Sequence, residues 1–159
     1  RHMHDYEGRD VQVVTHASNV RSLLAKIGTE SDDMTSIAPS TGAFPRVADY
    51  PAQSQFDIRV DGQFINKIAQ DGDMLHCVTS DAAGAEPQDG DLVVIAYRDE
   101  ATHRIMTRRM RQIGDFCEFR SESDDPALQN ASMIWNMRED SGKFRILGKV
   151  LFAYRRLAA

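Results

Sequence analysis

Alternating hydrophobic and polar positions dominate the chain from residue 56 onward and predict a succession of β-strands. Phe56, Ile58 and Val60 alternate with charged residues, which is the period-two pattern of a strand buried on one face. Further strands are predicted at 74–78, 92–97, 105–110, 116–119, 133–135 and 144–154. The run 92–97 is apolar at every position, which predicts burial on both faces. We therefore expect a mostly β domain over residues 56–159.

The first 55 residues have a different pattern. Residues 1–4 are interpreted as a tag remnant and leader, because a natural chain normally begins with Met. Apolar residues between 20 and 27 recur at helical spacing and predict one short amphipathic helix. Residues 29–55 are rich in Ser, Thr, Asp and Pro without a sustained period, which is typical of an extended linker. Residues 5–55 are thus expected to form an N-terminal helix and linker segment.

Composition favours one soluble cytoplasmic domain. The 159 residues carry 19 Lys and Arg against 24 Asp and Glu, a net charge of −5 that disfavours general binding to the nucleic-acid backbone. The two cysteines, Cys77 and Cys117, cannot form a thiolate zinc site, although one disulfide between them stays open. No apolar run is long enough to cross a bilayer, so no membrane partner is expected. We also expect no cofactor and no metal.

Two identical tripeptides, Asp71-Gly72-Asp73 and Asp89-Gly90-Asp91, each precede a predicted strand. Asp-Gly supplies the positive φ that a tight turn requires. The alternating oxygen ligands of a calcium loop are absent, so we interpret both tripeptides as turns rather than cation sites.

The sequence around these turns resembles the C-terminal domain of LexA and the phage repressors. The family pattern is V-x-G-D-S-M-N, then D-G-D before an apolar strand, and then D-G-D-x-V-V. The matching stretches here read IRVDGQFINKIAQDGDML over 58–75 and PQDGDLVV over 87–94. The likeness continues through IMTRRM over 105–110, similar to V-T-V-K-R-L, and through 121–126 and 146–150, and it covers about residues 56–156.

This resemblance implies a LexA-like or signal-peptidase-like fold of short twisted antiparallel sheets. It also implies a Ser-Lys dyad that cuts the domain's own linker, with a buried neutral lysine as the base. The serine position falls on Phe64 and the lysine position on Arg108. A phenyl ring has no nucleophilic atom, and a guanidinium stays protonated at neutral pH. The resemblance therefore implies that self-cleavage is lost.

The residues around the two dyad positions suggest what replaced the site. On a strand, Met106, Arg108 and Met110 point the same way, so Arg108 is expected to lie between apolar side chains. Phe64 can fill the former cleft, although a cleft retained for a peptide or small ligand stays open. The basic residues between 104 and 111 should divide between two faces of the strand, which argues against a nucleic-acid site.

From the resemblance we expect a non-enzymatic dimerisation and regulatory domain of a bacterial or prophage transcriptional repressor. The homodimer would bind DNA through an N-terminal helix-turn-helix domain that is not in this chain. Ile146, Phe152 and Tyr154, predicted to share one face of the last strand, are the candidate interface residues. One alternative is a pseudo-peptidase module that senses a peptide, an antirepressor or a small effector in the former cleft. Another is an active Ser-Lys peptidase that uses other residues.

Overall fold

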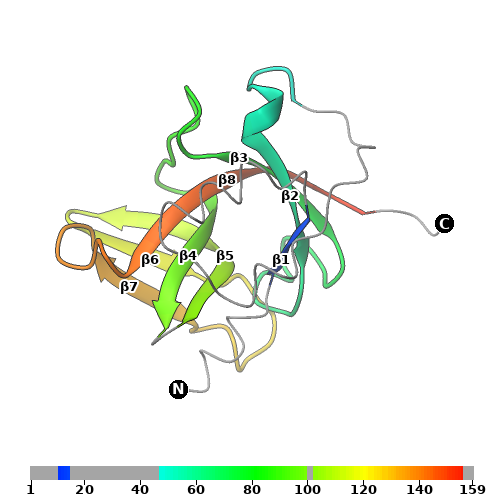
Figure 1. Cartoon of the computed structure of the whole chain (residues 1–159). Helices are drawn as coiled ribbons and strands as arrows, with labels where there is room; N and C mark the ends of the chain where they lie inside the picture. The colour runs from blue at the N-terminus through cyan, green and yellow to red at the C-terminus, as the bar shows by residue number, and fades with distance from the viewer. Residues whose placement is uncertain (1–10, 15–46, 100–101, 156–159) are drawn as a thin grey trace.

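The described strands form one antiparallel sheet (Figure 1). The computed structural model describes residues 11–14, 47–99 and 102–155. The sheet order is β1-β2-β3-β8-β4-β5-β6-β7. The strands are β1 (Val11–Val14), β2 (Gln55–Val60), β3 (Met74–Thr79), β4 (Leu92–Asp99), β5 (Thr102–Ile113), β6 (Phe116–Arg120), β7 (Ser132–Asn136) and β8 (Phe144–Tyr154). The predicted mostly β class is confirmed, whereas the helix predicted over 20–27 lies outside the described residues.

The N-terminal boundary of the sheet differs from the prediction. Strand β1 was not predicted, yet it pairs antiparallel with β2, with Val13 opposite Ile58. The end of the predicted linker is also structured, because a 3-10 helix (η2, Ala52–Ser54) leads directly into β2. Four residues in a polar context give too short an alternation for β1 to be recognised.

The sheet curves around two hydrophobic cores that share β4. The first core draws on β2, β3, β4, β5 and β8, and β1 also lies near β5. The second core draws on β4 to β8. On β4, Val94 and Ala96 face the first core, whereas Val93, Ile95 and Tyr97 face the second. All five are at most 2% exposed, so the predicted burial of this strand on both faces is confirmed.

Strand β8 changes its outward face twice along its length. Opposite β4, the register shifts between Val94 and Ile95, and Leu147 is the extra residue of β8. Opposite β3, it shifts between His76 and Cys77, and Leu151 is the extra residue. A bulge inserts one residue and reverses which side chains face the core. Ile146 therefore packs against the second core and Val150 against the first, while Phe152 lies beside His76. Because the second shift restores the parity that the first one changed, Ile146, Phe152 and Tyr154 lie opposite Ile95, His76 and Met74 and share one face of the sheet, as predicted.

The two Asp-Gly-Asp tripeptides form turns with the same hydrogen bonds. Gly72 and Gly90 have φ of 91° and 92°, as the turn interpretation requires. The last aspartate of each accepts from the backbone N–H three residues earlier, at 2.8 Å for Asp73 and 2.7 Å for Asp91. The first aspartate of each accepts from a facing backbone N–H at 2.8 Å. No cluster of potential metal ligands occurs among the described residues.

The two cysteines belong to opposite cores and do not form a disulfide. Cys77 lies in the first core and Cys117 in the second, and both thiols are free. Burial raises the pKa of each thiol, well above its ordinary value for Cys77. In the described part of the chain, no helix has both the length and the apolar character needed to cross a membrane.

Candidate functional site

The structure brings the two predicted dyad positions into direct contact. The guanidinium carbon of Arg108 lies 4.1 Å from the centroid of the Phe64 ring, the geometry of a cation–π contact. Phe64 is 2% exposed and Arg108 is 0% exposed. Met106 and Met110 are buried beside Arg108 on β5, as the alternation predicted. Residues 44 positions apart in the sequence thus meet where the resemblance places a nucleophile and its base.

Phe64 is held from both its backbone and its side chain. It lies in the turn region between β2 and β3, and its ring packs against Leu128 and Ala131. Its carbonyl accepts from the backbone N–H of Glu122 at 2.9 Å, and the Lys67 N–H donates to the Glu122 carbonyl at 3.1 Å. This short pairing fixes the ring over β5. The Phe64 position is therefore a packed part of the structure.

The backbone of β5 supports the buried guanidinium of Arg108. Nη1 of Arg108 donates to the Thr107 carbonyl at 2.7 Å, which helps to solvate a charge removed from water. Of the serines closest to this region, Ser121 Oγ donates to the Leu128 carbonyl and Ser123 Oγ accepts from the Asp125 N–H. Within the described residues, neither serine is hydrogen-bonded to a lysine amine.

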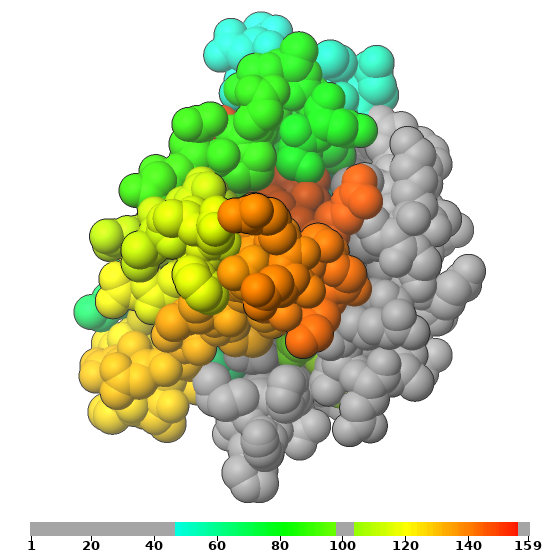
Figure 2. Space-filling view, turned by 90° about the vertical axis from the view of Figure 1, so that its left-hand side faces the viewer, coloured from blue at the N-terminus to red at the C-terminus, as the bar shows by residue number. Residues whose placement is uncertain are grey.

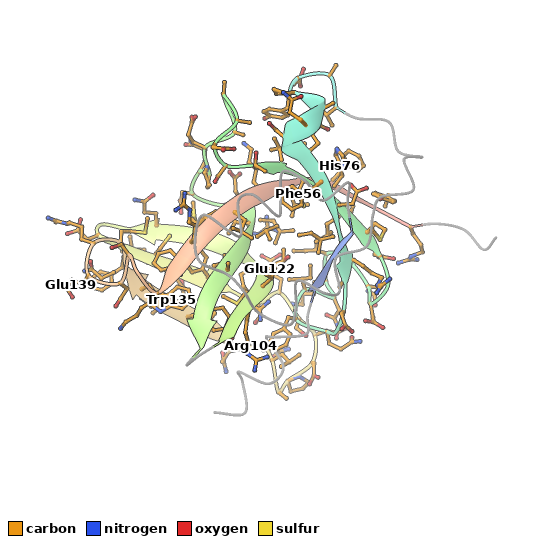
Figure 3. All side chains as sticks on the ribbon, in the orientation of Figure 1. Phe56, His76, Arg104, Glu122, Trp135 and Glu139 are labelled. Carbon is orange, nitrogen blue, oxygen red and sulfur yellow. The ribbon has the colours of Figure 1, made fainter. Side chains whose placement is uncertain are left out.

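A separate open cleft of about 800 Å³ lies on the other face of β5. Four basic residues (Lys67, Arg109, Arg111 and Arg120) line it, together with one acidic residue, Glu122. Glu122, labelled in Figure 3, accepts two hydrogen bonds from Arg109 at 3.0 and 2.8 Å. This contact lowers the pKa of Glu122 and raises that of Arg109. Strand alternation thus separates Arg108 from Arg109 and Arg111, as predicted.

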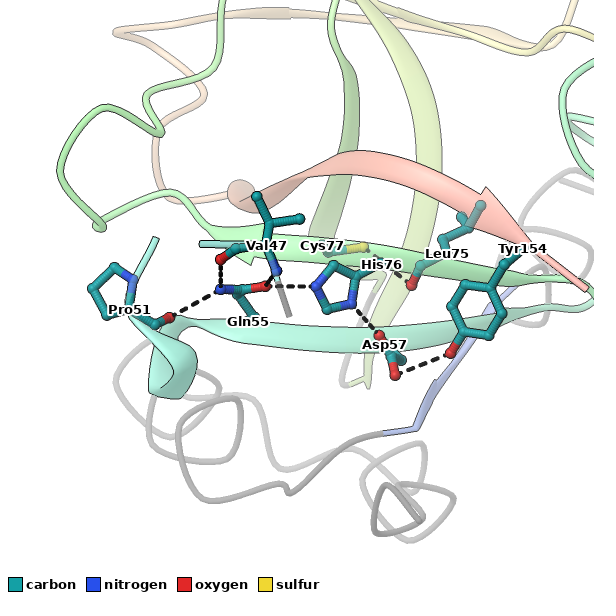
Figure 4. Close-up of polar contacts among 8 residues, drawn as sticks. All are labelled: Val47, Pro51, Gln55, Asp57, Leu75, His76, Cys77 and Tyr154. Atoms are coloured by element: carbon teal, nitrogen blue, oxygen red, sulfur yellow. Dashed lines mark hydrogen bonds and ion pairs between the residues drawn. The ribbon is translucent and has the colours of Figure 1, made fainter. Parts of the chain in front are cut away.

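A buried polar network, which the sequence did not predict, lies on the face of β2 and β3 that points away from the first core (Figure 4). His76 is 1% exposed, with Nδ1 2.6 Å from Asp57 Oδ1 and Nε2 2.6 Å from Gln55 Oε1. The Gln55 amide nitrogen donates to the carbonyls of Val47 and Tyr50, so its oxygen is the acceptor toward His76. Both ring nitrogens of His76 are therefore within hydrogen-bonding distance of a side-chain oxygen.

This network joins the C-terminal strand to β2 and β3. The Tyr154 hydroxyl donates to Asp57 Oδ2 at 3.0 Å, and the Phe152 ring stacks on His76 with centroids 4.9 Å apart. His76 is a hydrogen-bonded strand residue rather than an exposed one. Within the described part of the chain, no nucleophile is bonded to His76.

The candidate interface residues have three different environments. Ile146 is partly buried against the second core, and Tyr154 is half-buried and bonded to Asp57. Phe152 is 37% exposed, the most accessible large apolar side chain of β8. The alternation of polar and apolar positions did not distinguish the exposure of these three side chains. Phe152 is the member with free apolar surface.

Comparison of the chain with known protein families and with curated proteins finds no match.

Proposed function

We propose that this chain is a non-enzymatic pairing and regulatory domain of a helix-turn-helix transcriptional repressor, similar to LexA in ancestry and unable to cleave itself. The observation that carries the proposal is the contact between Phe64 and Arg108. Two side chains at the positions of a nucleophile and a base are buried against each other, with no reactive group between them.

Pairing is the function that such a domain retains. A twofold dimer presents two DNA-reading domains to two half-sites and raises the effective concentration of the second contact. Phe152, exposed beside Ala153 on the C-terminal half of β8, supplies an apolar element for the interface. The two free thiols accord with the reducing environment of a cytoplasm.

The first test is the oligomeric state of the chain. Light scattering at tens of micromolar should give the mass of a dimer, and Phe152→Asp should give a monomer. Because Phe152 also stacks on His76, urea unfolding of Phe152→Asp separates loss of pairing from local disruption. The matched control is Ile134→Asp, which places the same charge on an exposed apolar residue of β7 and should leave the dimer intact. A monomeric wild-type chain contradicts the pairing function.

The second test concerns catalysis. Incubation at alkaline pH, where a lysine base would be neutral, should leave the chain uncut, as judged by mass spectrometry. A clean cut within residues 29–55 would instead support the active-peptidase alternative. A helix-turn-helix sequence immediately upstream of the chain would support the assignment to a repressor.

A further inference from the structure

The outer face of the β5–β6–β7 region carries a basic half and an apolar half. The register places Arg109 opposite Arg120 and Ile113 opposite Phe116, and it places Ile134 opposite Glu118. Side chains on alternate positions of these strands therefore share the face that points away from the second core. Figure 2 is turned so that the hairpin ends on the left of Figure 1 face the viewer. We call this surface the outer face; it consists of Arg109, Arg111, Ile113, Phe116, Glu118, Arg120 and Ile134.

The basic half has unfilled hydrogen-bonding capacity. Nε of Arg111 lies 3.9 Å from Asp89, and Nε of Arg120 lies 3.8 Å from Glu118. These separations are beyond hydrogen-bonding distance, so within the described residues both guanidinium groups keep donors for a ligand. Arg109 differs because Glu122 already holds it in a bidentate contact. Arg109 and Glu122 thus hold each other in place in the cleft, whereas Arg111 and Arg120 keep hydrogen-bond donors for a ligand.

The placement of like charges points to an anion. Arg109 and Arg120 are direct cross-strand neighbours, and like charges in that position destabilise a sheet. Lys67 lines the same cleft, so four cations face one lining carboxylate, Glu122, and the cleft stays net positive when Asp89 and Glu118, beside Arg111 and Arg120, are counted. This balance is opposite in sign to the net charge of −5 of the chain. An added anion would relieve the repulsion.

The apolar half extends the same surface. Ile113 and Ile134 are each 61% exposed and Phe116 is 48% exposed. The three lie together at the end of the β5–β6 hairpin and on the adjoining β7. Large exposed apolar side chains beside a charged cleft are typical of a protein-binding surface.

The edge of β7 disfavours a second copy of the chain as the occupant. The Asn136 backbone N–H donates to Asp140 Oδ2 and its carbonyl accepts from the Asp140 N–H. At the other end, the Ser132 N–H donates to the Asn130 carbonyl. Local bonds thus occupy both ends of the strand, which blocks edge-to-edge pairing of sheets.

We propose that the outer face binds an acidic, extended segment of a partner protein, with an aliphatic or aromatic residue next to its carboxylates. An extended peptide has the same two-residue repeat as β5, so alternate carboxylates match the spacing of Arg109 and Arg111. The apolar residue of the segment packs on Ile113, Phe116 and Ile134. A nucleic-acid backbone has no apolar side chain to cover Ile113, Phe116 and Ile134, whereas a peptide has. This inference does not depend on the pairing function proposed above.

The test uses a fluorescent peptide of about ten residues in which glutamates alternate with threonines and an isoleucine and a phenylalanine follow. Fluorescence anisotropy with the full chain should show saturable binding that weakens as salt is added. Replacing both Arg111→Glu and Arg120→Glu should weaken binding by about tenfold or more. Ile134→Asp should also weaken it, because the apolar contact is lost. The milder pair Arg111→Gln and Arg120→Gln checks that the loss does not require new negative charge.

The matched control is the double variant Arg59→Glu and Arg145→Glu, two exposed arginines outside this face. It changes the net charge equally and should bind the peptide as the wild type does. Equal loss in the control, or no binding by the wild type, overturns the proposal. Tighter binding of a labelled single-stranded or duplex oligonucleotide at the same salt overturns it in favour of a nucleic-acid site. Dissociation of a dimer by Ile134→Asp overturns it in favour of an interface between copies.

Discussion

The contact between Phe64 and Arg108 predicts a measurable coupling free energy. The perturbation is a double-mutant cycle that combines Phe64→Leu with Arg108→Met. Leucine keeps an apolar side chain of similar size and removes the π-system, while methionine keeps an unbranched chain and removes the charge. Each single variant therefore removes one half of the contact seen at 4.1 Å. The cycle isolates the interaction between the two halves.

The magnitude follows from burial. A cation–π contact removed from water contributes about 2 kcal/mol, and both partners here are at most 2% exposed. The change of shape in Phe64→Leu adds about 1 kcal/mol. The variant should therefore lose about 3 kcal/mol when Arg108 is present and about 1 kcal/mol in the Arg108→Met background. Replacing a buried charge by an apolar group is often close to neutral, so Arg108→Met alone should change stability little.

Urea unfolding followed by circular dichroism measures these differences. With a slope of about 2 kcal/mol/M, Phe64→Leu should lower the midpoint by about 1.5 M. Phe56, equally buried in the first core, provides the control, since Phe56→Leu combined with Arg108→Met should show additive effects. A coupling free energy close to zero for Phe64 and Arg108 would refute the reasoning. The ring and the guanidinium would then be neighbours without mutual stabilisation.

Three further predictions concern other parts of the fold. Arg155 lowers the pKa of Asp73 through two hydrogen bonds at 2.6 and 2.9 Å, so this contact should stabilise the fold above the ordinary aspartate pKa and be lost as pH falls below it. Arg155→Met should reduce that acid sensitivity in thermal melts, and an unchanged pH profile would contradict the assignment. Gly148→Ala should cost about 3 kcal/mol in urea unfolding, because a Cβ would lie 2.2 Å from the Val78 carbonyl oxygen; a native-like midpoint would contradict this contact. The Cys77 thiol should resist an alkylating reagent in the native state and react in denaturant, as mass spectrometry of the labelled peptide will show, because burial raises its pKa.

Much of the sheet could be predicted because its strands keep the alternation that a buried face imposes. The continuous apolar run at 92–97 predicted a strand between two cores, and the two Asp-Gly-Asp turns were predicted from the positive φ that glycine allows. Alternation also predicted that Arg108 would point into a buried face and Arg109 away from it. These are local properties of a pattern.

The features that the sequence did not predict depend on register and on long-range contacts. The glycine at 148 is a position where a strand commonly bends and adjoins the bulge at Leu147, whereas the bulge at Leu151 is set by pairing with β3 and no local pattern marks it. The buried network of Gln55, Asp57 and His76 depends on the pairing of β2 with β3, which no local pattern indicates. The outer face also requires the pairing of Arg109 with Arg120, which only the hairpin geometry supplies.

The position of β4 between two cores has a consequence for how the molecule opens. Because Val93, Ile95 and Tyr97 pack on one side and Val94 and Ala96 on the other, neither core can be exposed without releasing the same strand. The two halves should therefore lose their structure in a single cooperative transition. In native-state hydrogen exchange, the amides of this strand should be the slowest in the protein, with protection equal to global unfolding.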